Sequence, residues 1–395
     1  MRKICLVLVG IYINMLGAFA QAVDSLPYKN RKLKVEEINF VSSYYHQEGN
    51  NSAVTGGIGT EKLSDYSNTF DVKLVKYDKL NRKRNLDIYV GVDYYTSASS
   101  DKIDLQANSS ASCEDLRVYP NVSWSIENEE KGTTVGTNIS SSIESDYLSF
   151  GFSGNFSKKT ADKNGEFGIK GQVYLDRVKL VLPIELRDGT RDFHDYDKTP
   201  RNTFGATLSY SQIINQRLQM MMMIDVAYQK GFLGLPFHRV YFMDSTLKAE
   251  MLPSTRFKLP VSLRANYFLG NKILLRSFYR FYKDDWGLKA HTMELEIPVK
   301  ITPFFSFSPF YRFYTQQGID YFSPYRSHAL TDRFFSSNYD LSSFDSHFFG
   351  AGLKIDPPRG ILGNKHWTMI ELRYGHYKRS NTLSSDIVSM NLKFK

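Results

Sequence analysis

The stretch Leu86-Asp-Ile-Tyr-Val-Gly-Val-Asp-Tyr-Tyr95 alternates between two kinds of side chain. Its even-numbered positions, from Leu86 to Tyr94, are all apolar, whereas its odd-numbered positions include the carboxylates Asp87 and Asp93. Because successive side chains of a β-strand point to opposite faces, this pattern predicts a strand with one apolar and one polar face. The fold class depends on whether the apolar face meets a protein core or lipid.

The N-terminal segment predicts that the chain is exported. Arg2 and Lys3 precede an apolar run that ends in Ala18-Phe-Ala20, the pattern of a secretory signal peptide. A single membrane helix is the alternative, but the run is short and no basic stop follows it. We therefore expect a cleaved signal peptide at 1–20, a short periplasmic lead at 21–33 and one domain at 34–395.

Composition excludes several classes of protein. Loss of Arg2 and Lys3 lowers the formal charge from +9 to +7, and no Lys/Arg cluster of the kind that binds nucleic acid is evident. Only Cys113 remains after processing, so no internal disulfide is expected. No later segment has eighteen consecutive apolar residues, yet 14% of the chain is aromatic. An exported, aromatic-rich chain of alternating strands is typical of a transmembrane β-barrel.

The alternation of Leu86 to Tyr95 recurs along the chain, for example from Arg217 to Tyr228, from His291 to Val299 and from Val388 to Lys395. An amphipathic strand at the C-terminus is usual for outer-membrane barrels, and its terminal aromatic is Phe394 here. The pattern predicts sixteen strands, with fourteen or eighteen if one hairpin is miscounted. Their expected ranges are 34–46, 68–77, 85–96, 115–126, 132–142, 147–157, 166–178, 203–214, 217–229, 256–268, 272–283, 288–300, 303–315, 344–356, 367–378 and 385–395.

Connection lengths give an independent argument for a barrel. The odd-numbered connections include five long segments, at 47–67, 97–114, 179–202, 230–255 and 316–343, whereas the even-numbered ones are all expected to be short. Short periplasmic turns and long extracellular loops are the arrangement of outer-membrane barrels. A soluble β-sandwich, the alternative, has no reason to segregate loop lengths in this way. We predict an all-β, antiparallel transmembrane barrel in the outer membrane of a Gram-negative bacterium.

If the apolar faces point outward, the opposite faces line the lumen. The charged residues on these faces have both signs in similar numbers, which fits a polar passage whose opposed charges select solutes. A lumen closed by salt bridges fits the same residues, and the sequence leaves both open. The lumen-lining candidates are Asp87, Asp93, Arg117, Lys170, Arg217, Asp225, Arg276, Arg280, Glu294, Glu296, Glu371 and Arg373.

The loop Gly231-Phe-Leu-Gly-Leu-Pro-Phe-His-Arg-Val-Tyr-Phe242 is unusually apolar for an extracellular segment. Such a loop either folds inward or contacts a partner. We expect it to pack into the barrel mouth as a constriction, with the aromatic loop 319–325 beside it. The constriction candidates are Phe232, Leu233, Phe237, Arg239 and Tyr241.

The sequence gives little support for an enzyme. The loop Arg191-Asp-Phe-His-Asp-Tyr-Asp197 collects carboxylates and His194, which could hold a metal or, with Asp284 and Asp285, resemble the outer-membrane proteases called omptins. The spacing is not theirs, and general-base chemistry needs convergent geometry. The run Met220 to Met223 fits flexible apolar filler better than a copper site, because its side chains alternate between faces. We expect no enzyme, no cofactor and no metal.

Several segments resemble a family of outer-membrane proteins, common in Bacteroidetes and other Gram-negative bacteria, that is known only as a domain of unknown function. The resemblance implies a barrel without established activity or known catalytic residues. Because members often neighbour flavin-transferring enzymes and small lipoproteins, it also implies a role as the sheath of an electron-transfer conduit. The similar segments are Gly231-Phe-Leu-Gly-Leu-Pro-Phe-His-Arg-Val-Tyr241, Leu275-Arg-Ser-Phe-Tyr-Arg-Phe-Tyr-Lys-Asp-Asp-Trp-Gly287, His291-Thr-Met-Glu-Leu-Glu296, Pro309-Phe-Tyr-Arg-Phe-Tyr-Thr-Gln-Gln317 and Ser337-Asn-Tyr-Asp-Leu-Ser-Ser-Phe344.

Taken together, the residues favour a porin-like passage for small solutes that is constricted by inward-folded loops. The alternative is a structural sheath or scaffold for a partner lipoprotein in the outer membrane or periplasm. Any redox centre would then belong to the partner, because the chain has no haem motif and no evident flavin attachment site. A surface hydrolase is a distant third.

Overall fold

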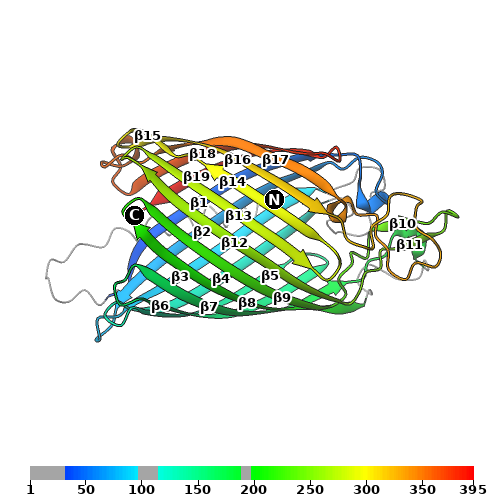
Figure 1. The fold of residues 1–395 in the computed structure, drawn as a ribbon, viewed down its shortest axis with the longest axis horizontal. Helices are drawn as coiled ribbons and strands as arrows, with labels where there is room; N and C mark the ends of the chain where they lie inside the picture. The colour runs from blue at the N-terminus through cyan, green and yellow to red at the C-terminus, as the bar shows by residue number, and fades with distance from the viewer. Residues whose placement is uncertain (1–31, 97–113, 188–196) are drawn as a thin grey trace, which may run out of the picture.

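The computed structural model describes residues 32–96, 114–187 and 197–395, which form a closed antiparallel β-barrel (Figure 1). Sixteen positions make up its wall, and one of them is shared by two short strands. In ring order the wall consists of β1 (Lys34–Glu48), β2 (Leu63–Tyr77), β3 (Lys83–Thr96), β4 (Glu114–Asn128), β5 (Thr133–Ile143), β6 (Tyr147–Lys159), β7 (Gly165–Lys179), β8 (Lys198–Asn215), β9 (Leu218–Gly231), β12 (Thr255–Leu269), β13 (Ile273–Asp284), β14 (Lys289–Glu296) with β15 (Val299–Thr302), β16 (Phe305–Gln317), β17 (Phe344–Ile355), β18 (Trp367–Arg379) and β19 (Ser384–Phe394).

Each strand pairs with its neighbours along the chain, and the ring closes where β1 pairs with β19. In that seam Ile38 lies opposite Phe394 and Glu48 opposite Ser384, so the two strands pair along nearly their whole length. Closure leaves no free strand edge, which is the condition for a β-structure to span a bilayer. No helix among the described residues is long and apolar enough to cross a membrane.

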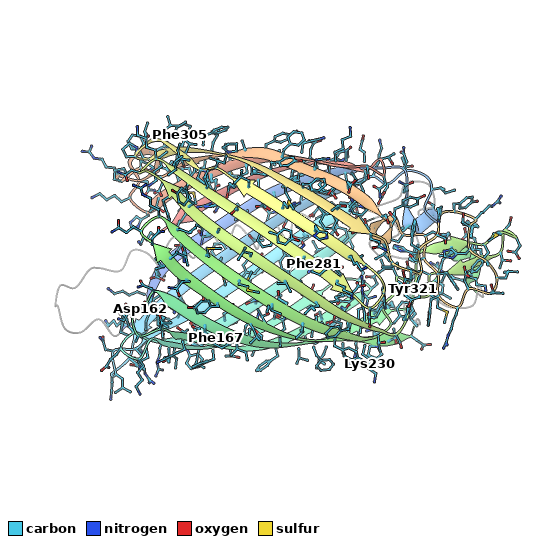
Figure 2. The ribbon with its side chains drawn as sticks, in the orientation of Figure 1. Asp162, Phe167, Lys230, Phe281, Phe305 and Tyr321 are labelled. Atoms are coloured by element: carbon cyan, nitrogen blue, oxygen red, sulfur yellow. The ribbon has the colours of Figure 1, made fainter. Side chains whose placement is uncertain are left out.

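The outer face of the barrel is apolar and exposed. Phe150, Phe152 and Leu175 have more than half of their surface exposed, as has Met293 on the far side of the ring. Phe167 likewise projects from the wall in Figure 2. An exposed apolar band of this size around a closed barrel is the surface that lipid covers. The apolar side of Leu86 to Tyr94 therefore faces lipid, and the predicted transmembrane barrel is confirmed.

All sixteen predicted strands are present, with differences at their ends. The strands β2 and β8 start at Leu63 and Lys198, five residues before their predicted starts. The predicted strand 288–300 is interrupted between β14 and β15. Pro298 explains the break, because proline has no backbone N–H to give to the neighbouring strand. The predicted signal peptide and nearly all of the predicted lead lie outside the described residues and stay predictions.

The two ends of the barrel differ in their connections. The turns at one end are short, apart from 356–366, which corrects the expectation that every even-numbered connection is short. That connection contains the 3-10 turn η5 (Ile361–Gly363). Long loops gather at the other end and hold η1 (Ala53–Thr55), η2 (Ile184–Leu186), η4 (Tyr339–Leu341) and the small hairpin of β10 (Arg239–Tyr241) and β11 (Leu247–Ala249) (Figure 1).

Two apolar clusters of the described residues lie at the loop end of the barrel, and the first reaches from the loops to Ala290 on the inner face of β14. Leu252, Trp286, Leu288, Ala290 and Ile319 form one cluster, and β10 with its neighbours forms another from Val240, Phe242 and Phe335. Such packed side chains stabilise loops that would otherwise be mobile. We call the loops 49–62, 232–254 and 318–343, together with the described part of 180–197, the cap.

Candidate functional site

The interior of the barrel is polar because, on each strand, the side chains that do not face lipid point into the lumen. On β3, Ile88, Val90 and Tyr94 are exposed on the outside, so Asp87 and Asp93 point inward. Residues directly opposite each other on paired strands share a face, and the register therefore extends this assignment around the ring. Asp93, for instance, lies opposite Ser67 on one side and Arg117 on the other.

Eleven of the twelve lumen-lining candidates lie in strands, and the register puts all eleven on the inner face. Asp225 is opposite Thr207 and accepts a hydrogen bond from it (2.5 Å). Arg217 differs, because it lies in the two-residue turn between β8 and β9. The Asn215 side chain accepts hydrogen bonds there from the Arg217 and Leu218 amides (2.9 and 3.0 Å), which holds the tight turn.

Charges of opposite sign lie on opposite walls of the lumen. Around the ring of sixteen, β2 and β12 are eight places apart, as are β3 and β13. The inner faces of β2 and β3 carry four aspartates, Asp65, Asp71, Asp87 and Asp93, together with Lys73 opposite Asp87. The inner faces of β12 and β13 carry Arg264, Arg276 and Arg280. Arginines on one wall and aspartates on the facing wall set up an electric field across the passage.

The arginine wall continues through an ion-pair network to β18. Glu296 binds Arg276 (3.1 Å) with one carboxylate oxygen and Arg373 (2.9 Å) with the other, and Arg373 also binds Glu371 (3.1 Å). The network crosses β17 over Gly352, where an added Cβ would lie 3.2 Å from the Arg373 side chain. The glycine therefore lets Arg373 lie flat against the wall. These pairs link side chains from β13, β14 and β18 along the wall.

Three further lumen arginines form no ion pair with any described residue. Arg312 stacks on the Phe348 ring (4.8 Å to its centroid), Arg264 on the Phe278 ring (5.6 Å), and Arg280 lies opposite Thr292. Stacking fixes the direction of a guanidinium while leaving its N–H donors available. Sequence reasoning missed Arg264 and Arg312, although the alternation of their strands places both on the polar side.

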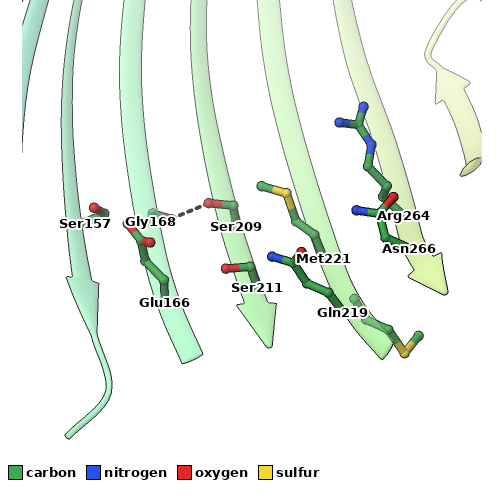
Figure 3. Close-up of a pocket in the computed structure, with 10 residues that line it drawn as sticks. Ser157, Glu166, Gly168, Ser209, Ser211, Gln219, Met221, Arg264 and Asn266 are labelled. Carbon is green, nitrogen blue, oxygen red and sulfur yellow. Dashed lines mark hydrogen bonds between the residues drawn. The ribbon is translucent and has the colours of Figure 1, made fainter. Parts of the chain in front are cut away.

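Two hollows lie in this lumen wall. The larger, of about 320 Å³, is near the short-turn end, and Figure 3 shows its side chains projecting from adjacent strands to one side of the sheet. Glu166, Ser211, Gln219, Arg264 and Asn266 are among its lining residues. The second, of about 240 Å³, lies between Arg312, Arg373, Phe310 and Phe348. Both have polar groups of several kinds, as expected for a hydrated wall.

Three carboxylates gather at the mouth beside β4 and β5. Asp115, Glu144 and Asp146 hold their ligand atoms within 4.8 Å of one another. Burial raises the pKa of Asp146 to about 6, with the neighbouring charges of Asp115 and Glu144 adding to the effect. The pKa of Glu144 is raised by burial as well. Arg117 Nε lies 3.5 Å from Glu144, and the Tyr95 hydroxyl donates to the same carboxylate (2.8 Å), so these neighbours offset part of the repulsion between the three carboxyl groups.

The cap bridges the mouth of the barrel. The loop between β1 and β2 and the loop between β9 and β12 lie on opposite sides of the ring, and they meet at Arg239. Arg239 is 1% exposed. Its Nη1 donates to the Val54 carbonyl (2.7 Å), while Nη2 and Nε donate to Glu185 Oε2 (2.7 and 3.0 Å). One buried side chain therefore ties together loops from three parts of the rim.

A second buried group fixes the same loop to 318–343. The Glu250 carboxylate accepts hydrogen bonds from the Ser336 hydroxyl (2.5 Å) and the Leu235 amide (2.7 Å), and His238 lies 3.7 Å away. Burial would raise the pKa of Glu250, but the neighbouring His238 and these hydrogen bonds hold it below its usual value. The group is therefore ionised and firmly held at neutral pH.

The five constriction candidates all lie in the cap. Phe237 and Arg239 are buried, Leu233 packs against the Trp286 cluster, and the Tyr241 ring contacts that of Tyr325 (5.1 Å). The Phe232 carbonyl accepts a hydrogen bond from Arg201 of β8 (2.8 Å). The loop 319–325 thus lies beside 231–242. That these residues narrow the solute path remains a prediction.

The residues of the hydrolase hypothesis are not brought together among the described residues. Asp284 is buried and accepts hydrogen bonds from Arg256 Nε (2.8 Å), Tyr282 (2.9 Å) and the amides of Trp286 and Leu288 (3.0 Å each), which is a structural role. Asp285 is exposed and accepts from the Phe257 amide (2.9 Å). His194 and Asp195 lie outside the described residues. Met220 and Met222 face outward and Met221 and Met223 inward, as the alternation predicts.

The chain is similar to one family profile and to several solved structures. A family profile described as "Protein of unknown function (DUF3570)" matches residues 13–385. No curated protein matches the sequence. Similar solved structures include a BenF-like porin from Pseudomonas fluorescens Pf-5 (8% identity, 91% of this chain and 98% of that one, TM-score 0.44). Another is Pseudomonas aeruginosa OpdQ (9% identity, 92% of this chain and 98% of that one, TM-score 0.43). A third is the siderophore receptor PirA from Acinetobacter baumannii (11% identity, 86% of this chain and 53% of that one, TM-score 0.45).

Proposed function

This chain belongs to the DUF3570 family of proteins of unknown function, and we propose that it is a porin-like channel of the outer membrane that passes small polar solutes. The facing walls of aspartate and arginine inside the closed barrel carry the proposal. Barrels of sixteen strands are wide enough to enclose an aqueous channel. An apolar outer surface with a charged interior is the arrangement by which such barrels conduct.

The charge pattern favours solutes that are themselves dipolar. A transverse field aligns a molecule that carries both charges, such as a zwitterion, and it gives no net pull to a neutral one. Arg264, Arg280 and Arg312 are open to such contacts because no described residue forms an ion pair with them. The cap then sets the size limit, because loops from opposite sides of the rim meet at Arg239.

Solute uptake into proteoliposomes tests this function. The refolded chain would be reconstituted, and the permeation of a neutral sugar, a zwitterionic amino acid and a small organic anion of similar size compared. We expect all three to enter, with the zwitterion fastest relative to its size. Neutralising both walls together, with Asp87→Asn, Asp93→Asn, Arg264→Gln and Arg280→Gln, should remove that preference while sugar permeation persists.

A folded barrel that admits none of the three solutes would contradict the channel. It would favour the second role, a sheath whose lumen is occupied by a partner lipoprotein. Co-purification of a lipoprotein that blocks the wild-type barrel would then be the next observation to seek.

A further inference from the structure

A second charged site lies on the outside of the barrel. We propose that Lys283, Lys289 and His291, on the outward faces of β13 and β14, bind the phosphate group of a lipid headgroup in the outer leaflet. The proposal needs only the orientation of the barrel in the membrane, and it stands whether or not the lumen conducts.

The two lysines are directly opposed. Lys283 pairs with Lys289 in the register of β13 and β14, two residues beyond the pair formed by Phe281 and His291. Both side chains are exposed, and neither forms an ion pair with any described residue. Like charges directly opposite each other destabilise a sheet. An anion bound between the two lysines would turn this destabilising contribution into a stabilising one.

His291 adds a third donor directed by its neighbours. The Tyr279 hydroxyl lies 2.9 Å from His291 Nδ1, and the Phe281 ring packs 5.2 Å from the imidazole. When Tyr279 donates to Nδ1, the proton resides on Nε2, which becomes a donor on the exposed edge of the ring. A phosphate monoester has up to two negative charges and three acceptor oxygens, which suits two ammonium groups and one imidazole.

The position of the site matches that of lipid headgroups. All three residues lie within three positions of the long-loop end of their strands. The two lysines lie immediately beyond the aromatic side chains Tyr279 and Phe281, and His291 lies level with Phe281. Figure 2 shows Phe281 on the wall toward that end. Aromatic girdles mark the membrane interface of outer-membrane barrels, so charges just beyond them lie at headgroup level. Of the two nearest acids along the chain, Asp284 faces inward and binds Arg256 (2.8 Å), and Asp285 accepts from the Phe257 amide (2.9 Å).

Native mass spectrometry can measure the binding directly. The refolded chain in micelles would be titrated with lipid A that carries two phosphate monoesters, and with the same lipid after enzymatic dephosphorylation. For the double variant Lys283→Gln/Lys289→Gln we expect roughly thirtyfold weaker retention of the phosphorylated lipid, about fivefold for each lysine lost at a membrane surface. Retention of the dephosphorylated lipid should be weak for both proteins.

A matched control separates this site from the general charge of the rim. Arg177 and Lys230 are exposed at the same end on β7 and β9, each two residues beyond an outward apolar side chain, Leu175 and Tyr228. Figure 2 shows Lys230 at that end. The variant Arg177→Gln/Lys230→Gln should bind within twofold of wild type. An equal loss in both double variants, or no loss in either, would overturn the proposal.

Two further measurements keep the test independent of folding. Lys289→Glu places opposite charges across the pair, so it should keep or raise the unfolding temperature of the barrel while abolishing lipid retention. Retained binding in Lys289→Glu would overturn the proposal. Inorganic phosphate should displace the lipid only at concentrations far above that of the lipid. Displacement at equal concentration would assign the site to free phosphate instead.

Discussion

Replacing Arg239 with Met should loosen the cap without unfolding the barrel. The guanidinium donates three hydrogen bonds, two of them to the Glu185 carboxylate and one to the Val54 carbonyl, and it is almost completely buried. Hydrogen bonds to charged groups contribute about 1.5–3 kcal/mol each. The Glu185 side chain is 33% exposed and regains water, so we discount its pair and expect a net loss of about 3 kcal/mol.

Hydrogen–deuterium exchange is the assay for this change. A loss of about 3 kcal/mol confined to the cap corresponds to roughly a hundredfold faster exchange of the amides in 49–62 and 232–254, under conditions in which the loops reclose faster than an open amide exchanges. Amides of the wall strands should be unaffected. The matched control is Arg333→Met, because Arg333 is an exposed cap residue that stacks on Phe334 and ties no loops together.

Conductance supplies the functional side of the same prediction. If the cap limits access to the lumen, Arg239→Met should raise the single-channel current, and Arg333→Met should not. Unchanged exchange in both loops would refute the assignment of Arg239 as the tie between opposite sides of the rim. Faster exchange with unchanged current would leave the tie intact but show that the cap does not limit flow.

Three other changes have directions that the structure specifies. Burial, together with the charge of Asp340, raises the pKa of Glu61 in the cap to about 7. The ionised form of Glu61 is therefore disfavoured in the folded state, and the stability of the cap should fall as pH rises from about 4.5 through 7. Glu61→Gln should flatten this pH dependence in hydrogen–deuterium exchange measurements. Arg280→Gln should shift ion selectivity toward cations by roughly fourfold at low salt, if a permeating ion passes about 5 Å from the Arg280 charge in water. Reversal potentials should show that this shift disappears as the salt concentration rises. Asp284→Ala leaves the nearly buried Arg256 unpaired and should destabilise the β13–β14 hairpin by about 3–5 kcal/mol in thermal unfolding, whereas Asp285→Ala should have little effect.

The strands could be predicted because their signal is local. A period of two in hydrophobicity, as in Leu86 to Tyr95, already specifies which side chains face lipid, and each strand can be read without knowing its neighbours. The starts of β2 and β8 were harder, because Leu63-Ser-Asp-Tyr-Ser67 and Lys198-Thr-Pro-Arg-Asn202 extend beyond the apolar band and lack the alternation.

The arrangement of charges across the lumen was not predictable from the sequence. Whether Asp87 faces Arg280 or lies beside it depends on the number of strands between them and on closure of the ring, which no single segment encodes. The meeting of Arg239 with Val54 has the same origin, because 185 residues separate them along the chain. The apolar loop 231–242 gave the signal that a cap exists, but not which loops it would join.

The central claim is that the interior of this barrel is a continuous aqueous path. Single-channel current through the refolded chain in a planar bilayer tests it most directly, at low and at high salt. We predict discrete, steady conductance whose ion selectivity weakens as salt screens the lumen charges. A correctly folded barrel that stays silent, both as wild type and with Arg239→Met, would contradict the account and identify the lumen as closed.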